Sequence, residues 1–142
     1  MFFEDLTMTG QLKIVLNDEV VQETNNLVVT AGKEWVADRM KGSNSAMSHM
    51  AIGTGSTAAA AGNTALGNEL DRNSLSTAGG TVSGATITFE CTWAAGDGTG
   101  AITEAGIFDA SSGGDMLART VFAVVNKGSS DVMTISWVVT VS

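Results

Sequence analysis

The chain has 142 residues, of which 15% are charged and 44% hydrophobic, and it contains 17 glycines but no proline or tyrosine. A chain of this length can bury enough surface as one domain to fold without a disulfide or a metal ion, and its single cysteine excludes an internal disulfide. Its 15 acidic and 7 basic residues give a formal net charge of −8, which argues against binding to the phosphate backbone of nucleic acids.

The first ten residues are rich in apolar side chains. Residues 1–10 are expected to form an arm that orders on a partner, or otherwise an edge strand, ahead of a single β-sandwich domain over residues 11–142. The candidates for partner contact in this arm are Phe2, Phe3, Leu6 and Met8. Acids at positions 4 and 5 stand where a signal peptide requires positive charge, and no stretch of about 18 apolar residues follows. We therefore expect synthesis in the cytoplasm and no membrane span.

Short strands are expected between this arm and the single helix. Period-two alternation over residues 11–16 predicts a strand, and Asn17-Asp18-Glu19 predicts a turn into a second strand at residues 20–22. A third short strand is expected at residues 27–29.

Residues 31–41 have the pattern of a helix. Thr30 is the expected N-cap, Glu34 is expected in the first turn, and Gly42 suits the left-handed position after the last turn. Gly32 is expected to weaken the first turn by roughly 1 kcal/mol relative to alanine. The apolar side chains expected to pack on a sheet are Trp35, Val36 and Met40.

The second half of the chain has the clearest strand patterns. Alternation over residues 85–94 places Ile87, Phe89, Cys91 and Trp93 on one face. Further strands are expected at residues 73–77, 81–82, 101–109, 116–125 and 133–141. About eight short strands separated by Gly, Ser and Asp turns, with one short helix, predict a mainly β fold. The expected architecture is an antiparallel β-sandwich that is jelly-roll-like or has a Greek-key arrangement.

The sequence offers little support for catalysis. Residues 53–58 match the Gly-x-Gly-x-x-Ala pattern of dinucleotide-binding loops, but the small, polar tract after them does not predict the helix that such a site requires. We interpret this segment as a loop that leaves a strand. His49 is the single histidine, and Cys91 falls on an inward strand face, where a thiol acts as a small hydrophobic group. We predict no catalytic residues, no cofactor and no enzymatic activity.

Metal and sugar sites are also not expected. Zinc requires three or four His, Cys or carboxylate ligands, which one histidine and one cysteine do not supply. Calcium is an alternative, because acids occur in or near turns at Asp97, Glu104, Asp109, Asp115 and Asp131. Turn chemistry explains these acids equally well, and none follows the EF-hand spacing. The three tryptophans fall on expected buried faces, which leaves few platforms for sugar rings.

Arg119 is the unusual residue on its predicted strand. It is expected to share a face with Leu117 and Val121, where a guanidinium group needs a carboxylate partner. Glu104, on the neighbouring predicted strand, is the expected partner in an internal ion pair. The alternative is that Arg119 extends into solvent at the edge of the strand.

Five segments and the end of the chain together carry a resemblance to a known class of protein domain. They are Asn26–Lys33, Met50–Ala58, Thr64–Arg72, Ile102–Ala110 and Met116–Phe122, followed by Lys127–Asp131 and Ile135–Trp137. These segments resemble a small β-rich domain of tailed-bacteriophage virions, commonly described as a tail-fibre or structural protein. The resemblance covers roughly residues 26–142 and implies a virion structural role, with no functional residues attached to it. Similar proteins often join this domain to receptor-binding modules, and the alanine run at residues 58–61 departs from them, since a proline is expected there.

The low content of charged residues agrees with this resemblance, because charged groups are depleted where protein surfaces become buried. The expected function is a capsid decoration (cement) protein, made in the bacterial cytoplasm and located in the virion. We expect a homo-oligomer, a trimer by preference, whose partners are the major capsid protein or tail proteins. A tail-fibre, neck or baseplate component is the alternative, and a carbohydrate-binding module is a more remote one.

Overall fold

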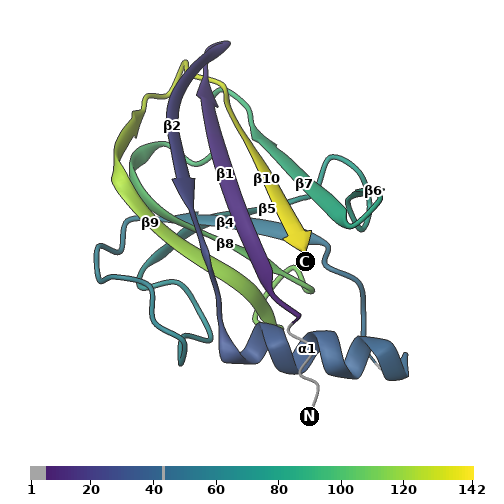
Figure 1. The fold of residues 1–142 in the computed structure, drawn as a ribbon. Helices are drawn as coiled ribbons and strands as arrows, with labels where there is room; N and C mark the ends of the chain where they lie inside the picture. The colour runs from purple at the N-terminus through teal and green to yellow at the C-terminus, as the bar shows by residue number, and fades with distance from the viewer. Residues whose placement is uncertain (1–5, 43) are drawn as a thin grey trace.

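Two antiparallel sheets of five strands pack face to face in the computed structural model, which describes residues 6–42 and 44–142 (Figure 1). The first sheet consists, in spatial order, of β2 (Glu19–Asn25), β1 (Met8–Leu16), β10 (Met133–Val141), β7 (Thr86–Trp93) and β6 (Thr81–Ser83). The second sheet consists of β3 (Leu27–Val28), β9 (Met116–Lys127), β8 (Gly100–Phe108), β4 (His49–Gly53) and β5 (Glu69–Ser74). The chain therefore folds as the expected β-sandwich, with one short helix, α1 (Thr30–Lys41).

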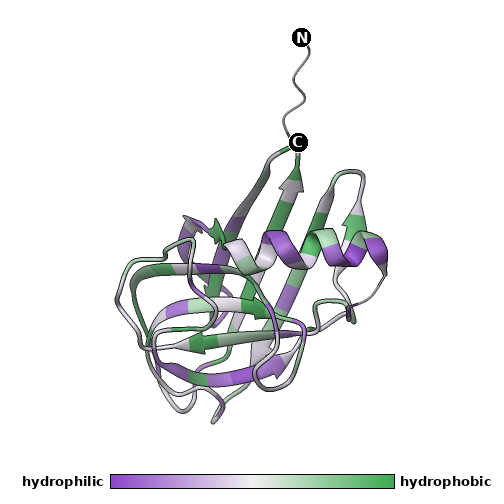
Figure 2. Cartoon of the chain, turned by 90° about the horizontal axis from the view of Figure 1, so that it is seen from below, coloured by the Kyte–Doolittle hydropathy of each residue, from purple (hydrophilic) through white to green (hydrophobic). Residues whose placement is uncertain are grey.

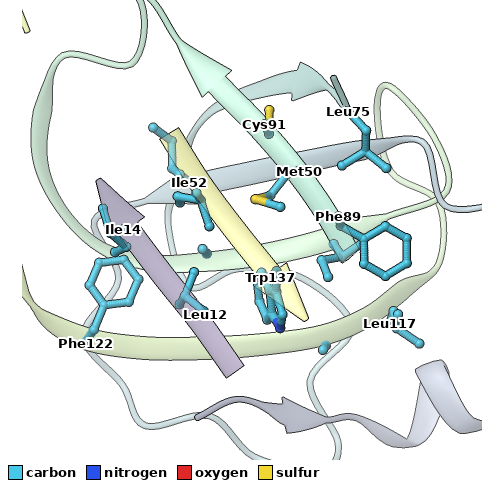
Figure 3. Close-up of a cluster of buried hydrophobic side chains, with 14 of the residues drawn as sticks. Leu12, Ile14, Met50, Ile52, Leu75, Phe89, Cys91, Leu117, Phe122 and Trp137 are labelled. Carbon is cyan, nitrogen blue, oxygen red and sulfur yellow. The ribbon is translucent and has the colours of Figure 1, made fainter. Parts of the chain in front are cut away.

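The main core lies between the sheets and follows from the period-two patterns. In β7, Phe89, Cys91 and Trp93 are buried, whereas Glu90 and Thr92 between them are exposed. Figure 3 shows side chains from both sheets meeting in this core. Among those labelled are Leu12, Ile14, Phe89, Cys91 and Trp137 from the first sheet and Met50, Ile52, Leu117 and Phe122 from the second. The burial of alternate apolar side chains supplies most of the driving force for packing the two layers.

The β1–β2 hairpin turns at the expected residues. Asn17 and Asp18 have φ angles of 50° and 67°, the left-handed pair that a two-residue type I′ turn requires. The side chain of Asn17 ties this tip to the β9–β10 turn, since its Nδ2 donates to Asp131 at 2.8 Å and its Oδ1 accepts from the Val132 N–H at 2.9 Å. Two hairpins that are distant in sequence are thereby held together.

The strand β1 lies inside the first sheet. It pairs with β2 on one side and with β10 on the other, and its register with β10 runs from Met8 opposite Val141 to Leu16 opposite Met133. Residues 8–10 pair with β10 alone, because the pairing of β1 with β2 begins at Gln11. Just before β1, the backbones of Thr7 and Ser142 exchange two hydrogen bonds of 2.8 and 2.9 Å. Thr7 and Ser142, near the two ends of the described chain, thus lie side by side.

Helix α1 crosses the end of the sandwich at which β1 starts (Figures 1 and 2). Its N-cap is Val29 rather than the expected Thr30, and no side chain caps it. The Thr30 N–H donates to the Ala61 carbonyl at 2.8 Å, so a tertiary contact satisfies one of the N–H groups that have no partner within the helix. Glu34 lies beyond the first turn. Gly42 ends the helix as expected, with a φ of 81°.

The apolar stripe of α1 is narrower than the sequence indicates. Trp35 and Val36 are half-buried against the main core, but Met40 is 84% exposed. Met40 follows Val36 by four residues and is its neighbour on the helix surface, but it lies in the last turn of α1. Gly32 is the one fully buried residue of α1, because the helix approaches the backbone of β9 at Leu117.

A second, smaller core covers the outer face of the second sheet. Its members are Val29, Ala51, Leu66, Phe108 and Met116. Leu66 belongs to residues 54–68, which connect β4 to β5 and which we call the covering loop. This segment contains no helical turn, in contrast to the turn expected near residues 64–66, and β5 begins earlier than the strand expected at residues 73–77. The outer face of the first sheet has no such cover in the described part of the chain.

Candidate functional site

The covering loop is fastened to the second sheet by a buried ion pair. Nη2 of Arg119, on β9, lies 3.0 Å from Oε1 of Glu104, on β8, and the exposed fractions of the two residues are 2% and 0%. The structure therefore brings together the two residues that the sequence suggested as an internal pair. Arg119 is not at a solvent-facing strand edge.

The Glu104 carboxylate is the centre of this network. Its Oε2 accepts hydrogen bonds from the backbone N–H groups of Gly55 and Asn68, each at 2.7 Å, and its Oε1 accepts from the N–H of Gly67 at 2.7 Å. The guanidinium of Arg119 adds two hydrogen bonds to Oε1, at 3.1 Å from Nε and 3.0 Å from Nη2. One carboxylate thus holds both ends of the covering loop.

Arg119 holds the middle of the same loop. Its Nη2 also donates to the Thr57 carbonyl at 3.0 Å, and its Nη1 donates to Oδ1 of Asn63 at 3.0 Å. The side chain of Asn63 in turn accepts from the N–H of Ala60 at 2.8 Å. The loop is therefore positioned by polar contacts along its length, with Leu66 as its buried apolar anchor.

The pKa of Glu104 is lowered in this environment. Burial acts to raise it, but the hydrogen bonds from Asn68, Gly67, Arg119 and Gly55 stabilise the charged form more strongly. Glu104 is therefore ionised at neutral pH, as the pairing with Arg119 requires.

Glycine is required where the loop approaches the carboxylate. A Cβ atom on Gly55 would collide with Oε2 of Glu104, and a Cβ on Gly67 would lie 3.3 Å from the Cα of Gly55. The Gly-x-Gly-x-x-Ala segment at residues 53–58 is thus a loop whose N–H donor faces the protein's own carboxylate. No helix follows it, so the geometry of a dinucleotide site is not present there.

Arg119 does not lie on the strand face on which the sequence analysis placed it. Leu117 is in the main core, whereas Arg119 lies opposite Gly106 and faces the covering loop. The ladder between β8 and β9 shifts register between Ile107 and Phe108, which breaks the simple alternation along β9. The expectation that Leu117 and Arg119 share a face was therefore wrong.

Sequence reasoning missed a second arginine with a similar role. Nε and Nη2 of Arg72, on β5, bind the Glu69 carboxylate at 3.1 and 2.6 Å, and its Nη1 donates to the carbonyls of Ala110 and Gly113, each at 2.9 Å. Its guanidinium also lies 3.8 Å from the centre of the Phe108 ring. The spacing of Glu69 and Arg72 was the available signal, but the carbonyl contacts depend on tertiary structure.

Lys127 is a further charged residue that the sequence did not single out. It is 1% exposed, at the end of β9, and its Nζ donates to the carbonyl of Ala94 at 3.0 Å. This contact joins the β7–β8 turn to the β9–β10 turn. The most deeply placed charged side chains of the chain therefore serve to fasten loops.

The remaining nucleophile and base candidates are engaged structurally. Burial and the charge of Asp71 raise the pKa of Cys91 to about 12, so its thiol is protonated at neutral pH. The two ring nitrogens of His49 lie 2.7 Å from Oγ of Ser48 and 3.3 Å from Oγ of Ser74. Each ring nitrogen of His49 therefore has a serine hydroxyl within hydrogen-bond distance.

Acidic side chains and tryptophan rings are the groups on which a metal or sugar site in this chain would depend. Within residues 6–42 and 44–142, no three His, Cys, Asp or Glu side chains gather closely enough to hold a metal ion. Trp93 and Trp137 are fully buried in the main core, and the indole of half-buried Trp35 donates to the Ser45 carbonyl at 3.0 Å. These rings do not offer an open platform for a sugar.

The expected arm is described only in part. Phe2 and Phe3 lie outside the described residues. Leu6 is 73% exposed, and Met8 opens β1 with its side chain partly packed on the main core. The structure thus separates Met8, which belongs to the sandwich, from Leu6, which is available for contact.

The described part of the chain contains no helix of the length and apolarity needed to cross a bilayer. Comparisons with protein-family models, curated proteins and solved structures gave no match to this chain.

Proposed function

We propose that this protein is a structural component of a tailed-bacteriophage virion, and that it decorates the capsid and stabilises the shell through protein–protein contacts. The observation that carries the proposal is where the phage-like segments lie in the fold. Most of them build the second sheet and its cover: Asn26–Lys33, Met50–Ala58, Thr64–Arg72, Ile102–Ala110 and Met116–Phe122. The resemblance therefore concerns the strands and loops that build the fold, which is consistent with a structural role in an assembly.

The chemistry of the charged residues supports the same proposal. Glu104, Arg119, Arg72 and Lys127 are occupied in holding loops, and Cys91 is protonated and buried. Charged and thiol side chains are common catalytic groups in enzymes, and here they make structural contacts. A protein whose buried charged side chains make structural contacts is suited to presenting surfaces to other proteins.

The surface that is left uncovered supports contact with other proteins. The outer face of the first sheet carries short hydroxyl side chains that alternate with the buried residues of β7 and β10. They include Thr86, Thr88, Thr92, Thr134, Ser136 and Thr140. These hydroxyl side chains carry no charge to desolvate when another protein covers them, and the charges on the same face, Lys13, Glu23 and Glu90, lie together across β2, β1 and β7.

The proposal is tested by counting copies in purified particles of the phage that encodes the protein. Quantitative mass spectrometry against the major capsid protein is expected to give a copy number in the range of the capsid subunits. Particles that lack the protein are expected to lose their DNA at a lower temperature, and added purified protein should restore the wild-type value. A copy number of a few per particle would instead assign the protein to the tail, neck or baseplate. Absence from particles would contradict a virion role altogether.

A further inference from the structure

The two ends of the sandwich differ in charge. At one end lie the β1–β2, β7–β8 and β9–β10 turns, since Met133 pairs with both Leu16 and Trp93, and Gly100 pairs with Lys127. We call this the hairpin end (Figure 1). Its acids are Asp18, Glu19, Asp97 and Asp131, and the amino group of Lys127 at these turns is buried.

The opposite end carries most of the exposed cations. Helix α1 bears Lys33, Arg39 and Lys41 against two acids, Glu34 and Asp38, so its formal charge is +1 (3 − 2), whereas the whole chain has −8. The polar segments of the helix are visible in Figure 2. Helix α1 is therefore net cationic, in contrast to the acidic turns of the hairpin end, whereas Glu4 and Asp5, which precede Leu6 in the sequence, lie outside the described residues.

An apolar groove lies at this helical end. It has a volume of about 410 Å³ and is lined by Leu6, Thr7, Met8, Lys33 and Val36, where α1 passes the start of β1. Leu6 and the nearby helix residue Met40 are 73% and 84% exposed. Large apolar side chains exposed together beside a cation are typical of a protein contact site.

We propose that this groove receives the β1–β2 hairpin tip of a second copy of the chain. The tip presents two adjacent acids, Asp18 and Glu19, followed by Val20, which is 50% exposed. These features complement Lys33 and the apolar lining of the groove. Contact between opposite charges, with apolar groups beside them, favours this orientation over end-to-end contacts of like charge.

Such a contact is head-to-tail, because the two copies use different surfaces. Head-to-tail contacts close into rings when the rotation between copies allows it, and otherwise form filaments. A hairpin tip in a groove of this size buries less than the roughly 800 Å² per partner of a stable complex. The isolated protein should therefore associate weakly, in a manner that depends on concentration and salt. The inference does not depend on the virion role proposed above.

Charge reversal at each surface provides the test, read by sedimentation velocity or light scattering at low salt. The tip variant Asp18→Lys/Glu19→Lys brings two lysines to Lys33 of a second copy, and the groove variant Lys33→Glu brings a glutamate to the acidic tip. Each variant alone is expected to associate at least about tenfold more weakly than the wild type. An equimolar mixture of the two should recover association, because each altered surface then meets a complementary one.

Matched controls reverse charges on the exposed outer face of the first sheet. Glu23→Lys/Glu90→Lys and Lys13→Glu make the same changes in net charge and are expected to leave association unchanged. Recovery in the mixture, with loss in each variant alone, supports the head-to-tail contact. A wild type that stays monomeric at high concentration overturns it, and the groove is then covered by another segment or protein. Association that is indifferent to both reversals also overturns it.

Discussion

Glu104 is the residue on which the outer layer of the second sheet depends. Its carboxylate accepts three backbone N–H groups of the covering loop and two hydrogen bonds from Arg119. A charged acceptor makes stronger hydrogen bonds than a neutral one, so one side chain replaces the regular secondary structure that the loop lacks. Both its charge and its acceptor capacity are needed.

Glu104→Gln is therefore expected to be strongly destabilising. It leaves the guanidinium of Arg119 buried without a counter-charge, which costs about 3–5 kcal/mol. In a domain of this size, the loss corresponds to a fall in Tm of roughly 10 °C. Differential scanning calorimetry of the variant and the wild type measures it.

Two further variants separate charge from acceptor capacity. Glu104→Leu/Arg119→Met removes both charges but leaves three loop N–H groups without an acceptor, so it should remain destabilised. Glu90→Gln, on the exposed face of β7, is the matched control and should change stability by less than about 0.5 kcal/mol. A double variant as stable as the wild type would show that the loop does not depend on this carboxylate.

Cys91 is expected to be unreactive in the native protein. With a pKa of about 12 and full burial, its thiol is not available as a thiolate at neutral pH. A thiol-specific reagent such as DTNB should label Cys91 only after the protein is unfolded in urea. Each chain should then release one equivalent of the thionitrobenzoate ion. Rapid stoichiometric labelling of the folded protein would contradict both the burial and the protonation state.

At the scale of elements, Gly32 determines how α1 docks. The sequence alone predicts that this glycine weakens the helix. In the fold, a Cβ atom at this position would collide with the carbonyl of Leu117 on β9. The helix and the strand therefore pack so closely that only glycine fits at this position, and the lower helix propensity of glycine is the cost of that packing.

Gly32→Ala is accordingly expected to destabilise the protein, although alanine is the better helix former by about 1 kcal/mol. The backbone of β9 cannot move without disturbing its ladder, so we expect a net loss of about 2 kcal/mol, within the range for overpacking. Urea denaturation measures this loss. Gly62→Ala is the control, since nothing lies within 4 Å of a Cβ there. A stabilised Gly32→Ala variant would mean that the helix does not contact β9 this closely.

Elements with a full period-two pattern were the ones that the sequence predicted well. β7 and β10 bury alternate side chains because each packs on the core with one face only. β5 was misplaced because its residues, Glu69–Ser74, are mostly polar and form an edge strand of the second sheet in which no residue is fully buried. Register shifts, such as the one that separates Leu117 from Arg119, arise from pairing with β8 and are not encoded in β9 alone.

The candidate site was predictable only in part. A glutamate and an arginine on apolar strands suggested a pair, because buried charges need partners. The three N–H groups that complete the site come from a loop with no regular pattern, and their position depends on the whole second sheet. Likewise, Arg72 and Lys127 bind carbonyl groups, which every residue has and no sequence motif marks.

For the whole molecule, acid is expected to act through two carboxylates. Burial acts to raise the pKa of Glu104, but the hydrogen bonds that its carboxylate accepts have the larger effect, so the net shift is downward. Hydrogen bonds from Asn17 and Gly128 lower the pKa of Asp131. A lowered folded-state pKa gives stability that is present above the unfolded-state value of about 4 and is lost as the pH falls through the folded-state value.

The Tm should therefore be nearly constant above about pH 5 and should decline below about pH 4. Because Glu104→Gln lacks one of the two groups, its Tm should decline less over the same interval. Thermal melts between neutral and strongly acidic pH compare the two profiles. Parallel profiles for the variant and the wild type would show that Glu104 does not contribute to the acid response.

The pairing of Thr7 with Ser142 also has a mechanical consequence. A pulling force applied through these two residues would load the β1–β10 ladder from one end, so that its hydrogen bonds break one after another. Force applied between Thr7 and the hairpin end would instead shear the ladder and meet all of its bonds at once. The sandwich should therefore unfold at a low force when it is pulled through Thr7 and Ser142. It should need a higher force when it is pulled through Thr7 and the hairpin end.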